Sequence, residues 1–334
     1  MDVLVLGGTR FLSSCVATEA LRRGHRVTCL ARGEGGAVPD GVRFVAADRT
    51  EPDAYTEVQQ PWDEVVDVSR QPGQVRSALA ALGSRARHWT FVSTGGVYAD
   101  TDVPGADETS RLLPAETGDV MAADGYGEAK VACEMACEEA VGDRLNRVRA
   151  GLIGGPGDLS DRLGWWPARF AQAAEEPERR PVLVPVAPQG RVQVVDVRDL
   201  AAWMLDAAEG GITGVFDAVG EQTSLRRVID ASARVAGYAG PRVDIPLPWL
   251  LDHGVEAWMG PDSLPLTLPV EGYEGFTTRS GAAAAAAGLR HRPLAEMLAD
   301  TLAYERDLGL ERERSSGLSP DTERRLLAQW SASA

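Results

Sequence analysis

A tyrosine and a lysine four residues apart form the clearest acid–base pair in this sequence. Tyr126 and Lys130 stand in "ADGYGEAKVACE", a Y-x-x-x-K spacing that puts both side chains on one face of a predicted helix. An ammonium group near a phenol favours the phenolate, which lowers the pKa of the tyrosine towards neutrality and makes it a usable general acid or base. Because this spacing also occurs by chance, the pair needs support from other residues.

Two hydroxyl side chains upstream provide that support. Ser93 and Thr94 end the apolar run "HWTFVST", which we predict to be the fifth strand. Ligands of α/β proteins bind at the carboxyl ends of the strands, so a hydroxyl at this position could polarise a substrate carbonyl.

The opening stretch "MDVLVLGGTRFLSS" partly matches a nucleotide-binding turn. Gly7 and Gly8 keep the sharp turn that lets backbone N–H groups and a helix N-terminus approach a pyrophosphate. Arg10 and Ser13 occupy the other two glycine positions of the pattern. Arg10 replaces a close approach with a guanidinium that could pair with phosphate, and an ordinary strand–helix turn is the alternative interpretation.

The residue at the end of the second predicted strand indicates whether the cofactor is NAD or NADP. An acidic residue there would bind the ribose 2′-hydroxyl of NAD, but the sequence has Arg32, which could pair with the 2′-phosphate of NADP together with Arg10. The alternative is a solvated arginine at a strand end. Asp48, at the end of "VRFVAAD", is positioned to accept a hydrogen bond from the adenine amino group, or to cap a turn.

The elements that must position these residues alternate between strand and helix. Short apolar runs predict strands at 2–6, 26–31, 42–48, 62–69, 88–94 and 146–158, and apolar residues at helical spacing predict helices at 11–23, 74–86 and 125–142. This order predicts an α/β fold with a Rossmann-type, doubly wound parallel sheet. We expect residues 191–209 to form a strand and a helix that return to the sheet, and the alanine run 282–288 to be a helix that Gly288 ends.

The domain organisation follows from where this pattern changes. We expect a dinucleotide-binding Rossmann domain over residues 1–160, with 182–220 returning to the sheet. Residues 161–181 and 221–334, with proline-rich and tryptophan-containing loops between helices, are expected to form a smaller, mostly helical substrate lobe.

Composition limits the classes of function. The 334 residues are 44% apolar and carry a formal net charge of −15, which disfavours binding to nucleic acid or to anionic membranes. Four cysteines without a C-x-x-C pair suit a reducing compartment and predict no metal site; Cys133 and Cys137 share a helix face and are interpreted as packing residues. No signal peptide or apolar run of spanning length is present, so we expect a cytoplasmic protein. We expect its partner to be a small-molecule substrate, and a homodimer is compatible with the sequence.

The combination of motifs resembles a known family. The GGTRFL opening, Asp48, the strand-end S-T-x-x-V-Y, the Y-x-x-x-K helix, "GLIGGPGD" and "VQVVDVRDLA" together are similar to the extended short-chain dehydrogenase/reductases of the NAD-dependent epimerase/dehydratase type. The likeness covers nearly the whole chain. The opening and the closing "RPLAEMLADTLAYERDLGL" resemble an actinobacterial reductase-like subgroup.

The resemblance implies catalytic roles for Thr94, Tyr126 and Lys130. Tyr126 would move a proton to or from a substrate oxygen, Lys130 would hold the ribose and tune Tyr126, and Thr94 would hydrogen-bond the oxygen. The expected cofactor is NADP, with NAD as the alternative. The predicted cofactor-binding residues are Gly7, Thr9, Arg10, Phe11, Leu12, Arg32, Asp48, Arg49, Val68, Ser93, Tyr126, Lys130 and Ile153.

Some residues depart from the family pattern. Arg10 and Ser13 replace glycines, Arg70 in "VSRQ" replaces a small residue beside the site, and Ala150 replaces a proline. These changes leave the catalytic groups in place but bear on cofactor affinity.

Three functions remain open from the sequence. The first is an NADP(H)-dependent reductase or dehydrogenase acting on a carbonyl or alcohol of a small or secondary metabolite. The second is a sugar-nucleotide epimerase or dehydratase that retains its cofactor. The third is a non-catalytic dinucleotide-sensing or RNA-binding relative, which the net charge and the Thr-Tyr-Lys set both disfavour.

Overall fold

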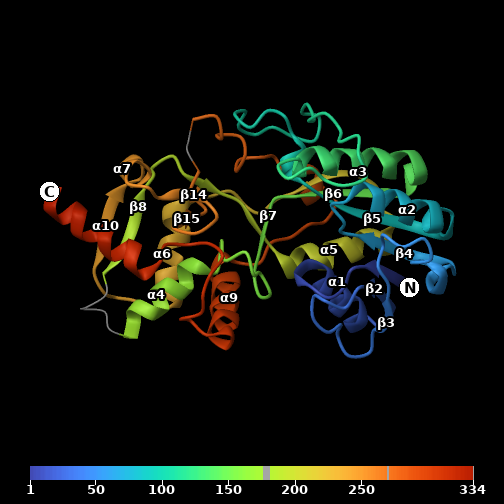
Figure 1. Ribbon diagram of the computed structural model, residues 1–334, viewed down its shortest axis with the longest axis horizontal. Helices are drawn as coiled ribbons and strands as arrows, with labels where there is room; N and C mark the ends of the chain where they lie inside the picture. Colours follow the sequence, from blue (N-terminus) through green and yellow to red (C-terminus); the bar gives the residue numbers. More distant parts are fainter. Residues whose placement is uncertain (176–180, 269–270, 334) are drawn as a thin grey trace. The chain divides into compact units, whose positions relative to one another are not determined.

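The computed structural model describes residues 1–175, 181–268 and 271–333, and it divides into two compact units (Figure 1). The first unit contains residues 1–152, 197–220 and 279–291, and the second contains 153–196, 221–278 and 292–334. We expected 153–160 and 182–196 to belong with the sheet and 279–291 with the other lobe, so the observed division differs at these three segments.

A seven-stranded parallel sheet, as far as the described residues extend, forms the centre of the first unit. Its order is β11-β6-β5-β4-β1-β2-β3, with β1 in the position where the connections reverse direction. The strands are β1 (Asp2–Leu6), β2 (Arg26–Ala31), β3 (Arg43–Ala46), β4 (Trp62–Asp67), β5 (Ala86–Thr94), β6 (Leu145–Ala150) and β11 (Gly214–Ala218). The predicted doubly wound Rossmann-type sheet is confirmed.

Helices cover both faces of this sheet. Figure 1 shows α1 (Phe11–Arg22) and α5 (Val197–Gly210) on one face and α2 (Pro72–Leu82) and α3 (Tyr126–Val141) on the other. Strand residues at alternate positions face each helical layer. The layer beneath α2 and α3 buries Leu4, Leu6, Val65, Trp89 and Phe91 with Val75, Leu79, Cys133 and Cys137. The two cysteines are therefore free thiols buried among apolar side chains.

The turn after β1 needs glycine for steric reasons. Gly8 has φ +98°, and a Cβ there would lie 2.2 Å from Cys29 Sγ on the neighbouring strand. No other residue fits without displacing β2, so the predicted sharp turn has a packing cause as well as a conformational one.

The second unit combines helices with short two-stranded sheets. Its helices are α4 (Trp165–Glu175), α6 (Leu225–Val235), α7 (Leu247–Asp252), α9 (Leu294–Leu308) and α10 (Pro320–Ser333). The strand pairs are β7 (Leu152–Gly154) with β10 (Val194–Asp196), β9 (Arg191–Val192) with β12 (Thr223–Ser224), β8 (Val182–Val186) with β13 (Arg242–Pro246), and β14 (Glu256–Trp258) with β15 (Ser263–Pro265).

One prediction about the sheet was wrong. The strand segment at 191–196 does not return to the main sheet, because β9 and β10 pair with short strands of the second unit. The strand that joins the sheet after α5 is β11, which pairs with β6. An apolar run predicts a strand but does not identify its partner, and these two strands are too short for their pattern to do so.

Two smaller features complete the fold. The alanine-rich helix is α8 (Ala282–Ala286), and Gly288 follows it with φ +101°, as predicted. Among the described helices, none has the length and apolar character needed to cross a membrane.

Candidate functional site

A cavity of about 950 Å³ opens at the carboxyl ends of β1, β2, β3 and β4 in the first unit. We call it the strand-end cavity. Its lining includes seven of the predicted cofactor-binding residues, namely Gly7, Thr9, Arg10, Arg32, Asp48, Arg49 and Val68. Phe11, Leu12, Ser93, Thr94, Tyr126 and Lys130 are not among the described residues that line it, and Ile153 belongs to the second unit.

Ser13 does not fill the cavity. Its Oγ donates a hydrogen bond of 2.8 Å to the carbonyl oxygen of Arg10, and the residue is buried within the first turn of α1. A Cβ on Gly7 would lie 3.2 Å from this Oγ, so the serine packs beneath the glycine turn. The third glycine position is thus occupied without loss of the turn.

Arg10 and Arg32 lie on the same cavity. Gly35 packs so closely on the preceding loop that a Cβ there would lie 2.5 Å from Thr9 Oγ1 and 2.8 Å from Arg10 Cγ. The loop after β2 therefore folds over Thr9 and Arg10. The Arg10 guanidinium makes no hydrogen bond or ion pair with any residue of the described ranges, while Arg32 forms an exposed ion pair with Glu34 at 3.1 Å. Exposed pairs of this kind are weak and exchange readily for another anion.

Asp48 caps a turn, the alternative named from the sequence. Its Oδ1 accepts hydrogen bonds from the Thr50 backbone N–H at 2.9 Å and from Thr50 Oγ1 at 2.8 Å. These bonds, with a smaller contribution from the charge of Arg32, hold the pKa of Asp48 below its usual value. The carboxylate is ionised at neutral pH and can accept a further donor at the cavity wall.

The Arg49 side chain is committed to the protein interior. Its guanidinium donates to both carboxylate oxygens of Asp67 at 2.9 and 2.8 Å and also to the Tyr55 hydroxyl and the Gln74 carbonyl. The side chain is 9% exposed. Arg49 therefore joins the segment after β3 to the end of β4 beside the cavity that it lines.

Lys130 is buried beneath the strand ends. Its Nζ donates to the carbonyl oxygens of Ser69 at 2.7 Å and Val92 at 2.6 Å, and it lies 4.8 Å from the centre of the Phe91 ring. Burial lowers the pKa of Lys130 to about 8. Lys130 is also the only lysine in the sequence, which otherwise uses arginine for its basic side chains. A lysine can release its proton in this range and an arginine cannot, a signal that the sequence analysis missed.

The other two predicted catalytic residues lie at element ends. Thr94 is the last residue of β5, and its Oγ1 accepts the Gly96 N–H at 3.1 Å, so its own O–H remains able to donate. Tyr126 is the first residue of α3 and is 43% exposed. Ser93 is buried, and its Oγ has no hydrogen-bond partner in the described part of the chain.

A buried polar network that the sequence analysis missed fixes the strand ends beyond Thr94. The Tyr98 hydroxyl donates to Asp217 at 2.7 Å and accepts from Arg149 at 3.0 Å. Arg149 in turn pairs with Glu134 on α3, and Arg279 pairs with Asp217. The network joins α3, β6 and β11, so the loop after β5 is held by ionic hydrogen bonds.

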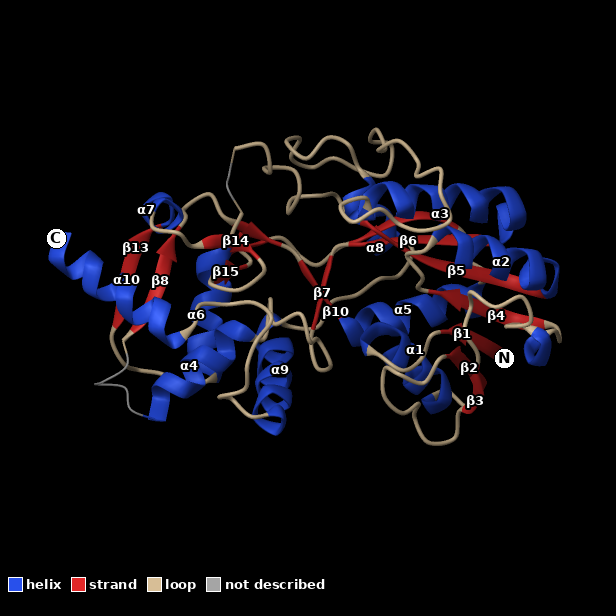
Figure 2. Cartoon of the chain, in the orientation of Figure 1, coloured by secondary structure: helices blue, strands red, loops and turns tan. Residues whose placement is uncertain are grey.

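The connection from β5 to α3 lies against the N-terminal part of α2. It is mostly loop, as Figure 2 shows. Within it, the Asp119 carbonyl accepts the Gly73 N–H at 2.9 Å, and the Met121 N–H donates to Gln71 Oε1 at 2.8 Å. Asp119 and Val120 line the strand-end cavity as a result.

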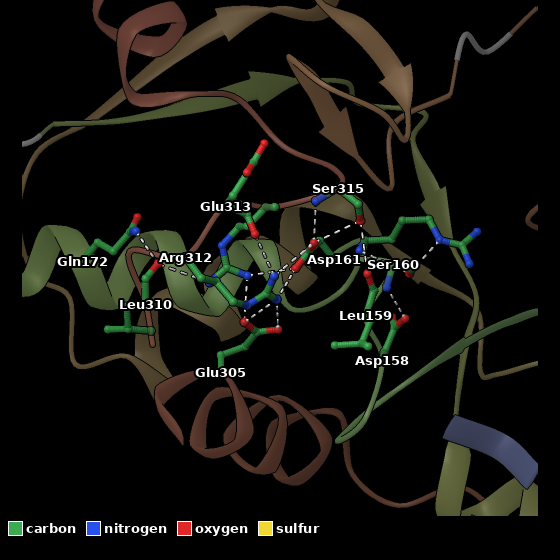
Figure 3. Close-up of polar contacts among 12 residues, drawn as sticks. Asp158, Leu159, Ser160, Asp161, Gln172, Glu305, Leu310, Arg312, Glu313 and Ser315 are labelled. Atoms are coloured by element: carbon green, nitrogen blue, oxygen red, sulfur yellow. Dashed lines mark hydrogen bonds and ion pairs between the residues drawn. The ribbon is translucent and has the colours of Figure 1, made fainter. Parts of the chain in front are cut away.

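A second polar cluster lies in the other unit (Figure 3). Asp161 and Glu305 are both buried, and Arg312 and Arg314 each pair with both carboxylates. The Ser315 backbone N–H also donates to Asp161 at 2.7 Å. Two carboxylates and two guanidinium groups balance in charge, which makes the cluster a clamp between the loop after β7 and the segment after α9.

Comparisons with known proteins give similarity in structure only. No protein-family model matches the chain, and no curated protein matches it in sequence. The UDP-glucose 4-epimerase of Thermus thermophilus, solved with NAD, is 22% identical with a TM-score of 0.65, over 92% of this chain and 99% of that one.

Two further solved structures are similar to the same extent. The UDP-glucuronic acid 4-epimerase of Bacillus cereus in complex with NAD is 16% identical with a TM-score of 0.67, over 92% of this chain and 98% of that one. The UDP-glucose 4-epimerase of Thermotoga maritima with UDP-glucose is 18% identical with a TM-score of 0.67, over 92% of this chain and 99% of that one. At these identities the likeness shows that this chain has the fold of the UDP-sugar epimerases.

Proposed function

We propose that this protein is a nicotinamide-dinucleotide-dependent enzyme of the epimerase/dehydratase type, acting on a hydroxyl-bearing carbon of a sugar nucleotide. The observation that carries the proposal is the strand-end cavity, which combines a glycine turn, a helix N-terminus and arginine side chains at one edge of a doubly wound sheet. Thr94, Tyr126 and Lys130 come from the next strand and helix along the chain.

The residues of the cavity fit a dinucleotide. Gly7 and Gly8 leave room for backbone N–H groups to approach a pyrophosphate, and Asp48 is suited to the adenine amino group. Arg10 and Arg32 are suited to a 2′-phosphate, so we propose NADP as the preferred cofactor, with NAD as the alternative. Arg49 and Val68 would shape the floor beneath the nucleotide.

Each predicted catalytic side chain has a distinct task in the proposed reaction. Tyr126 removes the proton from the substrate hydroxyl and returns it in the reverse direction. Lys130, protonated at neutral pH, stabilises the phenolate by its charge. The Thr94 hydroxyl donates to the substrate oxygen, because its own lone pair already accepts from Gly96. A bound nicotinamide supplies hydride acceptor and donor chemistry.

The substrate class rests on the similar structures. The Bacillus cereus and Thermotoga maritima structures are of 4-epimerases of UDP-sugars, and the Thermus thermophilus one was solved with NAD. An epimerase of this kind reoxidises what it reduces, so it needs no net supply of cofactor. Retention of the cofactor through turnover is therefore the property to test.

The experiment measures retained nucleotide and turnover together. The purified full-length protein is denatured, and released nucleotides are identified by mass spectrometry. The native protein is then incubated with a panel of UDP-sugars without added cofactor. Conversion of one sugar to its epimer or dehydrated product with NAD(P) retained supports the proposal; no affinity for any nicotinamide dinucleotide would exclude it.

An NADP(H)-dependent reductase with an exchangeable cofactor is the second candidate. Two arginines that line the cavity favour this second candidate. The Arg10 guanidinium is unpaired among the described residues, and Arg32 is exposed. In that case the protein would purify without nucleotide, and turnover would consume stoichiometric NADPH.

A further inference from the structure

The turn after β4 is held rigid by its own polar groups. Asp67 Oδ1 accepts the Ser69 N–H at 2.9 Å, and Ser69 Oγ donates to Gln74 Oε1 at 2.9 Å while accepting the Gln71 N–H at 3.1 Å. The Ser69 carbonyl receives the ammonium group of Lys130 at 2.7 Å. The residue within this turn is therefore presented from a fixed backbone.

That residue is Arg70, and its guanidinium is uncommitted. Arg70 is exposed and lines the strand-end cavity, yet it makes no hydrogen bond or ion pair with any residue in the described ranges. Its basic neighbours are engaged: Arg49 pairs with Asp67, and Arg76 pairs with Asp119. An arginine whose backbone is fixed and whose guanidinium has no partner among the described residues is available to an anionic ligand.

Arg70 reaches the cavity from the opposite side to Arg32. The strand order β2-β1-β4 puts β1 and its glycine turn between the two arginines. Strands are about 4.8 Å apart, so β2 and β4 are separated by roughly 10 Å. Arg32 pairs with Glu34 of the loop after β2, and its charge acts on Asp48, which follows β3. Arg70 therefore lines the cavity on the β4 side of the glycine turn.

We propose that Arg70 binds the pyrophosphate of the dinucleotide, the group that NAD and NADP share. The proposal rests on the proposed function, because it assumes a dinucleotide in the strand-end cavity. The glycine turn carries Arg10 and Ser13 in place of two glycines, and the first turn of α1 has no acidic residue to repel a diphosphate. A guanidinium approaching from β4 supplies the charge that a diphosphate needs in a chain of net charge −15.

The proposal predicts that Arg70 and Arg32 bind different groups of the cofactor, the diphosphate and the 2′-phosphate. Binding of NAD, NADP, ADP and 2′-AMP to the full-length protein is measured by calorimetry. Arg70→Ala is expected to weaken NAD, NADP and ADP alike, by about tenfold for a partly solvated charged hydrogen bond, and to leave 2′-AMP nearly unchanged. Arg32→Ala is expected to weaken only NADP and 2′-AMP. Arg70→Lys should recover part of the loss, because it keeps the charge without the bidentate geometry.

A matched control is Arg43→Ala, which removes an exposed arginine of β3 that does not line the cavity and should change none of the four affinities. A loss confined to NADP and 2′-AMP in Arg70→Ala would overturn the proposal by assigning Arg70 to the 2′-phosphate. Unchanged affinities would remove Arg70 from the site. If the wild-type protein binds NAD and NADP, either result counts against Arg70 alone; if it binds neither, the proposed function fails first and this proposal with it.

Discussion

The ammonium group of Lys130 donates a 2.7 Å hydrogen bond to the carbonyl oxygen of Ser69, the residue that precedes Arg70. A second bond to the Val92 carbonyl ties the same ammonium to the end of β5. One buried charge thus connects α3 to the carboxyl ends of two neighbouring strands. Lys130 accordingly positions the backbone on which the proposed ligand-binding side chains stand, in addition to any electrostatic effect on Tyr126.

The pKa of Lys130 can be measured directly, because the sequence contains a single lysine. Burial lowers this pKa to about 8, below the ordinary value. Lysine labelled with ¹³C and ¹⁵N gives a single Nζ resonance, whose titration should show a midpoint near pH 8. A midpoint at the value of a free lysine would mean that the ammonium is solvated.

The same shift predicts how stability depends on pH. Between about pH 8 and pH 10.5 the unfolded chain still binds a proton that folded Lys130 has released, so the free energy of unfolding rises with pH in this window, by about 3 kcal/mol at most. Lys130→Met should lack this rise. Urea unfolding of both proteins across the window isolates the lysine contribution, since other titrating groups cancel in the difference; parallel curves would contradict the expectation.

Tyr126→Phe tests the proposed proton transfer. Removing the hydroxyl should lower turnover by about 10²-fold or more, the usual loss for a general acid–base group, while cofactor binding persists. Tyr273→Phe is a matched control, because both tyrosines are 43% exposed. Turnover is measured on the UDP-sugar found to react. Full activity in Tyr126→Phe would remove this residue from the mechanism.

The sequence predicted the elements better than the fates of individual side chains. Strand–helix alternation was enough to predict a parallel sheet, because the predicted strands up to residue 150 all pair in that one sheet. It did not predict that β9 and β10 pair within the second unit, since partner choice depends on three-dimensional context. Arg49 was expected at the cofactor, yet its guanidinium is turned inward to Asp67.

Clusters of residues from distant segments could not be predicted from the sequence either, because their contacts depend on the three-dimensional fold. Asp161, Glu305 and Arg312 come together from segments far apart in the chain, and no local spacing marks them. The lone lysine, in contrast, was visible in the sequence and identifies the one basic position where arginine was not used.

Gly164→Ala tests whether the Asp161 cluster stabilises the second unit. A Cβ on Gly164 would lie 2.2 Å from Glu305 Oε1, and this buried carboxylate is held by Arg312 and Arg314 (Figure 3). The carboxylate must move and break its ionic hydrogen bonds, so we expect a loss of about 1–3 kcal/mol in the free energy of unfolding.

The control for this substitution is Gly83→Ala. A Cβ there would make an ordinary contact of 3.6 Å with Val141, and the backbone φ of −56° suits alanine. Its free energy of unfolding should be unchanged or slightly higher. Equal free energies of unfolding for the two variants would show that Glu305 can move away from the new methyl group without loss of stability.

Arg32→Asp tests the choice of cofactor. The guanidinium of Arg32 is exposed and pairs only loosely with Glu34, so it can exchange this carboxylate for a 2′-phosphate. Wild type should therefore bind NADP more tightly than NAD by about tenfold, the value of one partly solvated charged hydrogen bond. Arg32→Asp should erase or reverse this preference, because a carboxylate repels the 2′-phosphate and accepts from a free 2′-hydroxyl.

Glu34→Gln should act in the opposite direction, because it removes the carboxylate that competes with the 2′-phosphate for Arg32. Calorimetric titration of both cofactors decides the matter: equal affinities in wild type, or a Glu34→Gln variant with weaker NADP binding, would mean that these arginines do not read the 2′-phosphate.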